Sequence, residues 1–283
     1  MLQVQSTHYR PFLKWAGGKS KLIEQYIPYF PQSFTNYYEP FLGGGAVFFY
    51  FCGVKPDANK FISDVNPELI NTYCCIKNNV EPLISLLKTH QLQHNRDYYY
   101  QMRSSAIAPA RSHWEGSEIE RAARFIYLNK TCFNGLYREN LRGLFNVPMG
   151  KYKNPTICNE DSLRSVSVAL QSAAVSLNPY DEINSKNEQD FVYFDPPYYP
   201  LSSTSNFTNY SRYVFKEAEQ IKLRDKFAQL ANKGVKVMLS NSDCAFVREL
   251  YADFNIYEIL ASRAINSQAE KRGKITELLI TSY

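Results

Sequence analysis

The stretch Asp190-Phe191-Val192-Tyr193-Phe194-Asp195-Pro196-Pro197-Tyr198 decides the fold of this 283-residue chain. It begins with a short apolar run of aromatic and β-branched side chains, which is typical of a buried strand. The strand has to end at the two prolines, because proline lacks an N–H and has a fixed φ. We therefore expect a rigid turn at the carboxyl end of a strand, which is the edge of an open α/β sheet where ligands bind.

Three groups of this turn point to a reaction: the carboxylate of Asp195, the carbonyl of Pro196 and the ring of Tyr198. An exocyclic amine such as adenine N6 is a weak nucleophile, because its lone pair is delocalised into the ring. Two acceptors that take its N–H bonds would return that pair to nitrogen, and an aromatic ring can stack on the base. The pattern predicts methyl transfer to an exocyclic amine, although a strand-ending turn without catalytic function uses the same residue types.

The composition is typical of a globular protein, with 45% hydrophobic and 21% charged residues. The length suffices for one large domain or two modest ones. No stretch approaches the length of a membrane span, and residues 1–10 lack the apolar core of a signal peptide, so we expect a cytoplasmic protein. The cysteines show no C-x-x-C spacing, which predicts reduced, packed thiols and no metal site. They are Cys52, Cys74, Cys75, Cys132, Cys158 and Cys244.

The positive charge is concentrated in one segment, Arg121–Lys153, which holds a single acid, Glu139. Aromatic residues are interleaved with its cations. This combination suits a nucleic-acid surface, although a solvated basic face fits the charges equally well. The cations are Arg121, Arg124, Lys130, Arg138, Arg142, Lys151 and Lys153, and the aromatic residues include Phe133, Tyr137, Phe145 and Tyr152.

A glycine pair precedes Lys19 in the sequence PFLKWAGGKSK at Pro11–Lys21. The backbone of such a loop can approach a ligand closely, and a helix is expected to follow it. A phosphate-binding P-loop would need glycine five residues before Gly18, where this chain has Leu13. The motif therefore does not indicate a nucleoside triphosphatase.

A second glycine loop lies in Asn36–Gly45, which reads NYYEPFLGGG and precedes an apolar, helix-like run. Strand, glycine loop and helix form the first unit of a Rossmann-like nucleotide fold. Asp64 ends the next expected strand, where an acid commonly accepts hydrogen bonds from ribose hydroxyls. Asp64 or Asn66 could instead cap the following helix, and the two functions are compatible. Together these signals predict a nucleoside cofactor.

Helical periodicity dominates residues 67–133 and returns from Glu160. Between them, the segment FNGLYRENLRGLFNVPMGKYKNP at Phe133–Pro155 repeats glycine and asparagine, which predicts a basic hairpin that projects from the helices. A polar loop at Leu201–Ser211 is expected to act as a lid beside the site. The remaining expected elements are strands at 174–177, 235–240, 255–260 and 275–281 and a helix at 216–231.

Six stretches, in this order, resemble the Dam-type DNA adenine-N6 methyltransferases of the alpha group, and the resemblance covers nearly the whole chain. It implies an α/β fold with a Rossmann-like, S-adenosylmethionine-dependent methyltransferase domain at 1–69 and 159–283. It also implies an inserted helical DNA target-recognition domain at 70–158 that carries the hairpin. The matching stretches are FLKWAGGKSKL, YYEPFLGGGAVFF, ISDVNPELI, NGLYRENLRGLFNVPMGKYKNP, YFDPPYYPLSSTSNFTNY and VMLSNSD.

The resemblance also implies a function for each matched residue. Asp195, Pro196 and Tyr198 would hold a flipped adenine, with Asp195 also near the methyl donor. Many members of the family have tyrosine where this chain has Phe133, whose ring can still wedge between bases but has no hydroxyl. The expected donor-binding residues are Trp15, Lys19, Phe41, Gly43 and Asp64. The residues expected to face the recognition sequence are Lys14, Phe133, Asn134, Leu136, Arg138 and Pro148, and those expected to contact phosphates are Arg142, Lys151 and Lys153.

The reaction implied by the resemblance is methyl transfer from S-adenosylmethionine to adenine N6 in double-stranded DNA, in the sequence GATC. Transfer would be direct after base flipping, and the chain has no Pro-Cys nucleophile of the cytosine-C5 kind. A cytosine-N4 methyltransferase is the nearest alternative, because the same acid and carbonyl serve either amine. An inactive DNA-binding module is the alternative from another class, and the intact Asp195, Asp64 and Lys19 argue against it. The expected partners are DNA at the nucleoid and, in a restriction-modification system, a cognate restriction endonuclease.

Overall fold

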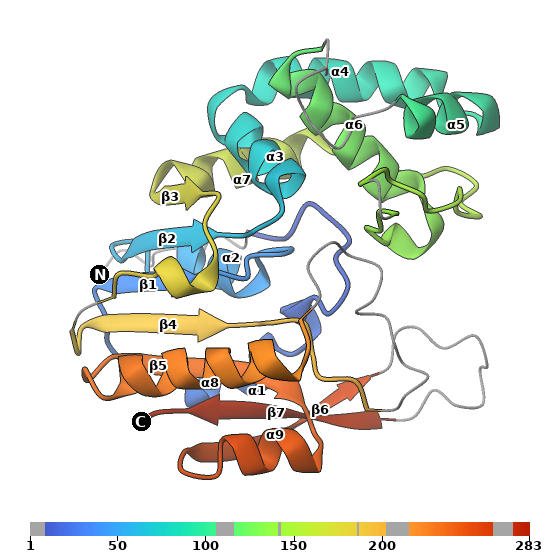
Figure 1. Ribbon diagram of the computed structural model, residues 1–283. Coiled ribbons are helices and arrows are strands. Elements are labelled where there is room, and N and C mark those ends of the chain that lie inside the picture. The colour runs from blue at the N-terminus through green and yellow to red at the C-terminus, as the bar shows by residue number, and fades with distance from the viewer. Residues whose placement is uncertain (1–8, 106–115, 141–142, 186, 202–214, 263–273) are drawn as a thin grey trace.

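The structure is a computed structural model that describes residues 9–105, 116–140, 143–185, 187–201, 215–262 and 274–283. Its centre is a seven-stranded sheet with the strand order β3-β2-β1-β4-β5-β7-β6 (Figure 1). Neighbouring strands are parallel from β3 to β5, and β7 pairs antiparallel with both β5 and β6. The strands are β1 Asn36–Glu39, β2 Asn59–Ser63, β3 Ala173–Ser176, β4 Asp190–Phe194, β5 Lys236–Ser242, β6 Asn255–Ser262 and β7 Lys274–Thr281.

Strand β4 is buried along its whole length, which confirms the central strand expected from this stretch. Phe191 and Tyr193 belong to one buried cluster, and Val192 and Phe194 belong to the other. The strand is apolar throughout because both faces of the sheet are covered, as is usual in parallel sheets. The prolines that follow place Asp195 at the carboxyl edge of the sheet.

Helices cover both faces of the sheet (Figure 1). Helices α8 (Glu217–Ala231) and α9 (Ala245–Leu250) contribute to the buried cluster on one face. Helices α1 (Ile23–Tyr26) and α2 (Ala46–Val54) contribute to the cluster on the other face. This is the layered α/β arrangement expected from the strand, glycine-loop and helix unit.

The described residues between β2 and β3 form a group of five α-helices, which lies at the β3 edge of the sheet (Figure 1). Helix α3 packs against α6 and α7, and buried residues of this group share one cluster with α2. The domain boundary expected between residues 69 and 70 falls inside helix α3, which is continuous there. The boundary stays a prediction. The helices are α3 Pro67–Asn78, α4 Val80–Gln93, α5 Arg96–Ser104, α6 Glu118–Thr131 and α7 Glu160–Gln171.

The basic segment after α6 folds back on itself, which agrees with the expected hairpin. Antiparallel bridges join Cys132 to Met149 and Glu139 to Phe145. Asn134 has a left-handed φ of 55°, which asparagine tolerates better than most residues. Gly135 and Gly143 of the same segment are also left-handed, with φ of 64° and 72°, so these three positions serve tight turns of the backbone.

Strand β5 extends two residues beyond its expected end, because the polar residues Ser240–Ser242 are buried and pair with β7. The expected lid at 201–211 is described only at Leu201, and Arg142 also lies outside the described residues. No helix in the described parts of the chain is long and apolar enough to cross a membrane.

Candidate active site

The glycine loop after β1 packs closely against Trp15. A Cβ at Gly43 would lie 2.7 Å from the indole Cδ1, and one at Gly44 would lie 3.2 Å from the Trp15 Cβ. Gly43 has a φ of 48°, a left-handed conformation that glycine adopts without strain. Trp15 also stacks on Tyr137, with ring centroids 5.9 Å apart. The two expected donor-binding residues Trp15 and Gly43 are therefore in contact, although they come from different segments.

Asp64 follows β2 and contacts the same loop from the neighbouring strand. Its carboxylate accepts hydrogen bonds from the backbone N–H groups of Gly43 at 3.1 Å and Asn66 at 2.9 Å. Burial raises the pKa of Asp64 to about 6, and these backbone hydrogen bonds oppose the rise. The cap of α3 is Asn66, whose side chain accepts from the N–H groups of Glu68 and Leu69. The helix cap left open by the sequence therefore belongs to Asn66, and the ribose contact of Asp64 stays a prediction.

Lys19 and Asp195 form an ion pair beside this loop. Lys19 Nζ lies 2.8 Å from Asp195 Oδ1, and the two side chains are only 4% and 20% exposed. The same ammonium donates to the carbonyl of Gly17 at 2.5 Å. Ser240 of β5 donates a second hydrogen bond to Asp195 Oδ1 at 2.8 Å. The orientation of the Asp195 carboxylate is thus set by two segments distant from it in the sequence.

The ring of Tyr198 lies next to this ion pair, with Lys19 Nζ 4.8 Å from its centroid. Its hydroxyl donates to Glu277 Oε2 of β7 at 2.7 Å. Burial raises the pKa of Glu277, whereas the charge of Lys19 lowers it. The hydroxyl of Tyr198 is therefore bound to β7, and the backbone of Tyr198 lies shortly after the end of β4.

A buried polar network holds the backbone of the turn. Gln220 of α8 donates to the carbonyl of Pro197 at 2.9 Å and accepts from Asn241 of β5 at 3.0 Å. Asn241 Oδ1 also accepts the N–H of Tyr199 at 3.1 Å. Both amide side chains are fully buried, where an unsatisfied polar group costs about 1–3 kcal/mol. The network therefore restricts the positions that the backbone around Pro196 can adopt.

The residues expected to face a recognition sequence lie on the hairpin and on the N-terminal segment. Phe133 is 47% exposed despite its apolar ring. Asn146 accepts from the Nε of Arg138 at 2.7 Å, which orients the guanidinium across the hairpin. The exposed members of this set are Lys14, Phe133, Asn134 and Pro148, and the half-buried members are Leu136 and Arg138. Lys151 and Lys153, which are expected to contact phosphates, are also exposed.

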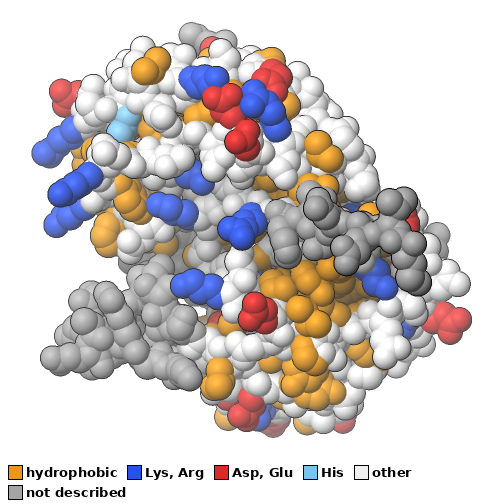
Figure 2. All heavy atoms as spheres, turned by 180° about the vertical axis from the view of Figure 1, so that it is seen from behind, with side chains coloured by type: hydrophobic (Ala, Val, Ile, Leu, Met, Phe, Trp, Pro, Cys, Tyr) orange, Lys and Arg blue, Asp and Glu red, His pale blue; other side chains and the backbone are white. Residues whose placement is uncertain are grey.

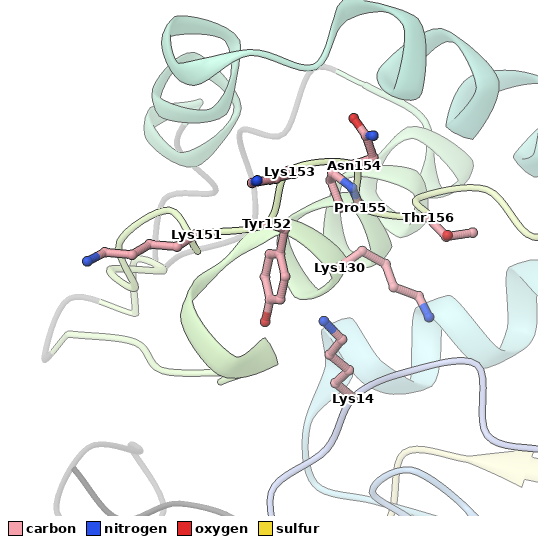
Figure 3. Close-up of a pocket in the computed structure, with 8 residues that line it drawn as sticks. All are labelled: Lys14, Lys130, Lys151, Tyr152, Lys153, Asn154, Pro155 and Thr156. Carbon is pink, nitrogen blue, oxygen red and sulfur yellow. The ribbon is translucent and has the colours of Figure 1, made fainter. Parts of the chain in front are cut away.

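A basic pocket of about 510 Å³ lies between the hairpin and the N-terminal segment (Figure 3). Burial lowers the pKa of Lys130, and the charge of Lys14 lowers it further. Lys and Arg side chains also gather at the left of Figure 2, the side formed by the helical group and the hairpin. Clustered cations of this kind attract backbone phosphates. The pocket is lined by Lys14, Lys130, Lys151, Tyr152, Lys153, Asn154, Pro155 and Thr156.

Phe41 stacks on Tyr180, with ring centroids 5.3 Å apart, and also packs against Phe194 at the end of β4. The structure thus brings the expected donor-binding and catalytic residues to one edge of the sheet.

Within the described ranges, no group of three or more His, Cys, Asp or Glu residues could hold a metal ion.

Among the residues to which the sequence assigned no function are Ser240 and Glu277, which bind Asp195 and Tyr198, and Asn129, which binds the backbone of Lys14. The polar end of an otherwise apolar strand was a usable signal for Ser240. No local signal identifies the other two, because their hydrogen-bond partners, Tyr198 for Glu277 and Lys14 for Asn129, lie far away in the sequence.

Comparison with known proteins agrees with this geometry. The family of D12 class N6 adenine-specific DNA methyltransferases matches residues 15–265. The type II methyltransferase M1.LlaDCHI of Lactococcus lactis subsp. cremoris is 44% identical, over 100% of this chain and 99% of that protein. The type II methyltransferase M.MjaIII of Methanocaldococcus jannaschii is 40% identical, over 97% of this chain and 99% of that protein. The DNA adenine methylase of Haemophilus influenzae is 36% identical, over 96% of this chain and 93% of that protein. The chain therefore belongs to the D12 class of N6 adenine-specific DNA methyltransferases.

Proposed function

We propose that this enzyme transfers a methyl group from S-adenosylmethionine to N6 of adenine in the double-stranded sequence GATC. The observation that carries the proposal is the meeting of three segments at Asp195, which pairs with Lys19 and accepts from Ser240. This point lies at the carboxyl ends of β1 and β4, between which the strand order reverses. Ligands of open α/β sheets bind at such a switch point.

The residues around the glycine loop fit S-adenosylmethionine. Because Gly43 and Gly44 have no Cβ, the Trp15 side chain lies directly against the loop proposed to hold the donor. Asp64 offers a carboxylate to ribose hydroxyls, and Lys19 offers a buried cation to the donor's carboxylate. Bound there, S-adenosylmethionine would supply a methyl group on a positively charged sulfur, which is open to direct nucleophilic attack.

We expect Asp64→Ala to weaken S-adenosylmethionine binding by about 1–3 kcal/mol, the range for lost hydrogen bonds to a charged group. Because burial raises the pKa of Asp64 to about 6, protonation should also weaken wild-type binding as the pH falls through that value. Asp64→Ala should lack this decline. Calorimetry from pH 5 to 8 measures both effects. Asn66→Ala is the matched control, because it removes the helix cap and should lower thermal stability without lowering donor affinity. An unchanged affinity in Asp64→Ala would exclude the ribose contact.

The end of β4 acts on the adenine amine. The Asp195 carboxylate and the Pro196 carbonyl accept its two N–H bonds, which returns the nitrogen lone pair toward the methyl group. The Tyr198 ring stacks on the flipped base. Ser240 and Lys19 hold the carboxylate in place, so little reorganisation is needed when the base arrives.

Glu277 should affect the reaction through the Tyr198 ring. We expect Glu277→Ala to slow methyl transfer roughly two- to tenfold, which corresponds to one hydrogen bond of about 0.5–1.5 kcal/mol. In a Tyr198→Phe background the same change should have almost no further effect, because the hydroxyl that Glu277 binds is already absent. Single-turnover rates of the four proteins form the double-mutant cycle. Fully additive losses would show that Glu277 acts without Tyr198.

The basic hairpin and pocket suit double-stranded DNA. Extruding a base from the duplex costs a few kcal/mol, and phosphate contacts by Lys151 and Lys153 offset that cost with a strong dependence on salt. We propose that the ring of Phe133, which is 47% exposed, fills the space that the base leaves. Arg138, whose guanidinium is oriented by Asn146, is proposed to read guanine.

The names of two relatives support a place in a restriction-modification system, because both are called type II methyltransferases. We propose that the chain protects DNA from a cognate restriction endonuclease. Methylated plasmid should resist cleavage by an endonuclease that cuts only unmethylated GATC, and complete cleavage would refute this protection.

The proposed activity is tested by incubating an unmethylated plasmid with labelled S-adenosylmethionine. Nucleoside analysis should find the label in N6-methyladenine, and methylation-sensitive sequencing should place it in GATC. Label in N4-methylcytosine would overturn the adenine assignment. Label in adenine outside GATC would overturn the proposed recognition sequence and leave the adenine assignment intact.

A further inference from the structure

Asn129 of α6 joins the N-terminal segment to the hairpin. Its Oδ1 accepts the N–H of Lys14 at 2.9 Å, and its Nδ2 donates to the carbonyl of Lys14 at 2.7 Å. The same Nδ2 donates to the carbonyl of Gly135 at 3.1 Å. Asn129 is 3% exposed, so these hydrogen bonds have little competition from water. One buried amide therefore binds both backbone groups of Lys14 and the first turn of the hairpin.

Lys14 is held at several further points. A Cβ at Gly135 would lie 2.4 Å from the Lys14 Cβ, so the two backbones approach as closely as glycine permits. The Lys14 ammonium lies 3.9 Å from the centroid of the Tyr152 ring, at the base of the hairpin (Figure 3). In the sequence, Lys14 is the neighbour of the expected donor-binding residue Trp15. In the structure, it lies against the hairpin, on the surface expected to face DNA.

We propose that Asn129 is a positioning residue that sets sequence discrimination by fixing Lys14 relative to the hairpin. The inference rests on the proposed function and on the expectation that Lys14, like Arg138, faces the recognition sequence. Two side chains read neighbouring bases only when the distance between their backbones is fixed, because base-edge hydrogen bonds tolerate little displacement. Asn129 supplies that fixed distance.

Asparagine suits this position because its amide both accepts and donates. Aspartate keeps the acceptor for the Lys14 N–H but loses the donors to the carbonyls of Lys14 and Gly135. Alanine loses all three hydrogen bonds and leaves buried backbone groups unsatisfied. The segment at Lys14 should then shift relative to the hairpin while the donor site and the phosphate contacts remain.

The test compares Asn129→Ala and Asn129→Asp with wild type on GATC duplexes and on duplexes with one substituted base pair, at fixed salt. Competition binding and kcat/KM are both measured. Discrimination should fall about tenfold in each variant, while affinity for S-adenosylmethionine without DNA changes less than about threefold. In a Lys14→Ala background, Asn129→Asp should reduce discrimination little further, because the side chain being positioned is absent.

Thr131→Val is the matched control for a general loss of stability. Thr131 lies in the same helix, is 1% exposed, and its hydroxyl donates within that helix to the Tyr127 carbonyl at 2.6 Å. The Thr131→Val variant should have a lower melting temperature than the wild type and the same sequence discrimination. If Asn129→Ala does not fold, Asn129→Asp decides the question.

The outcomes separate this inference from the proposed function. Wild-type discrimination that persists in a folded Asn129 variant would overturn the inference alone, as would an equal loss of discrimination in Thr131→Val. A wild-type enzyme that methylates all duplexes equally would overturn the proposed recognition function and this inference with it.

Discussion

Replacing Asp195 with asparagine should reduce methyl transfer at least about 10²-fold, the effect of removing one preorganised electrostatic group, and should leave duplex binding nearly unchanged. Asparagine preserves the size of the side chain but removes its charge and one acceptor. Its amide would present a donor either to the adenine amine or to Lys19, which now lies 2.8 Å from the carboxylate. The amine would then keep its lone pair in the ring and remain a weak nucleophile.

Single-turnover kinetics with saturating donor measures this effect, and fluorescence anisotropy measures duplex affinity. Ser240→Ala is the matched variant, because it removes one hydrogen bond to Asp195 and preserves the charge; its loss of rate should be much smaller. Donor affinity has to be measured in parallel, because Lys19 loses its ionic partner in Asp195→Asn. Near-normal turnover in Asp195→Asn would remove this carboxylate from the mechanism.

Arg138→Ala should lose the preference for GATC over duplexes that differ at one base pair. Arginine suits guanine because two of its donors meet O6 and N7 together, and a good bidentate pair discriminates by about 1–3 kcal/mol. In this structure Asn146 accepts from the Nε of Arg138 at 2.7 Å, which orients the planar group in advance. Turnover on matched and singly substituted duplexes at fixed salt measures the loss.

Lys151→Ala is the control for Arg138→Ala. Lys151 lines the basic pocket, where it is expected to contact phosphate, so its removal should weaken binding to all sequences alike and flatten the salt dependence. If Arg138→Ala slows every duplex equally, Arg138 contacts the DNA backbone and the GATC proposal loses its physical support in this chain.

The sequence alone determined the central strand, the turn after it and the glycine loop. Strand β4 could be predicted because its residues are apolar on both faces and two prolines end it. Gly43 and Asn134 could be identified as turn positions because few residues adopt their left-handed φ. The turns depend on the backbone conformations that proline, glycine and asparagine allow, and the strand depends on the apolar pattern of its own side chains, so each signal is local in the sequence.

Only the tertiary structure decided which side chains act together. Glu277 reaches Tyr198 because β7 enters the sheet between β5 and β6, an order that the spacing of apolar residues does not specify. Asn129 has the appearance of an ordinary polar residue in a helix, and its partner Lys14 lies 115 residues away. A buried polar side chain must find hydrogen-bond partners, but the sequence does not say which ones. The fold supplies them by bringing distant segments together, and such pairings leave no periodic signal in the chain.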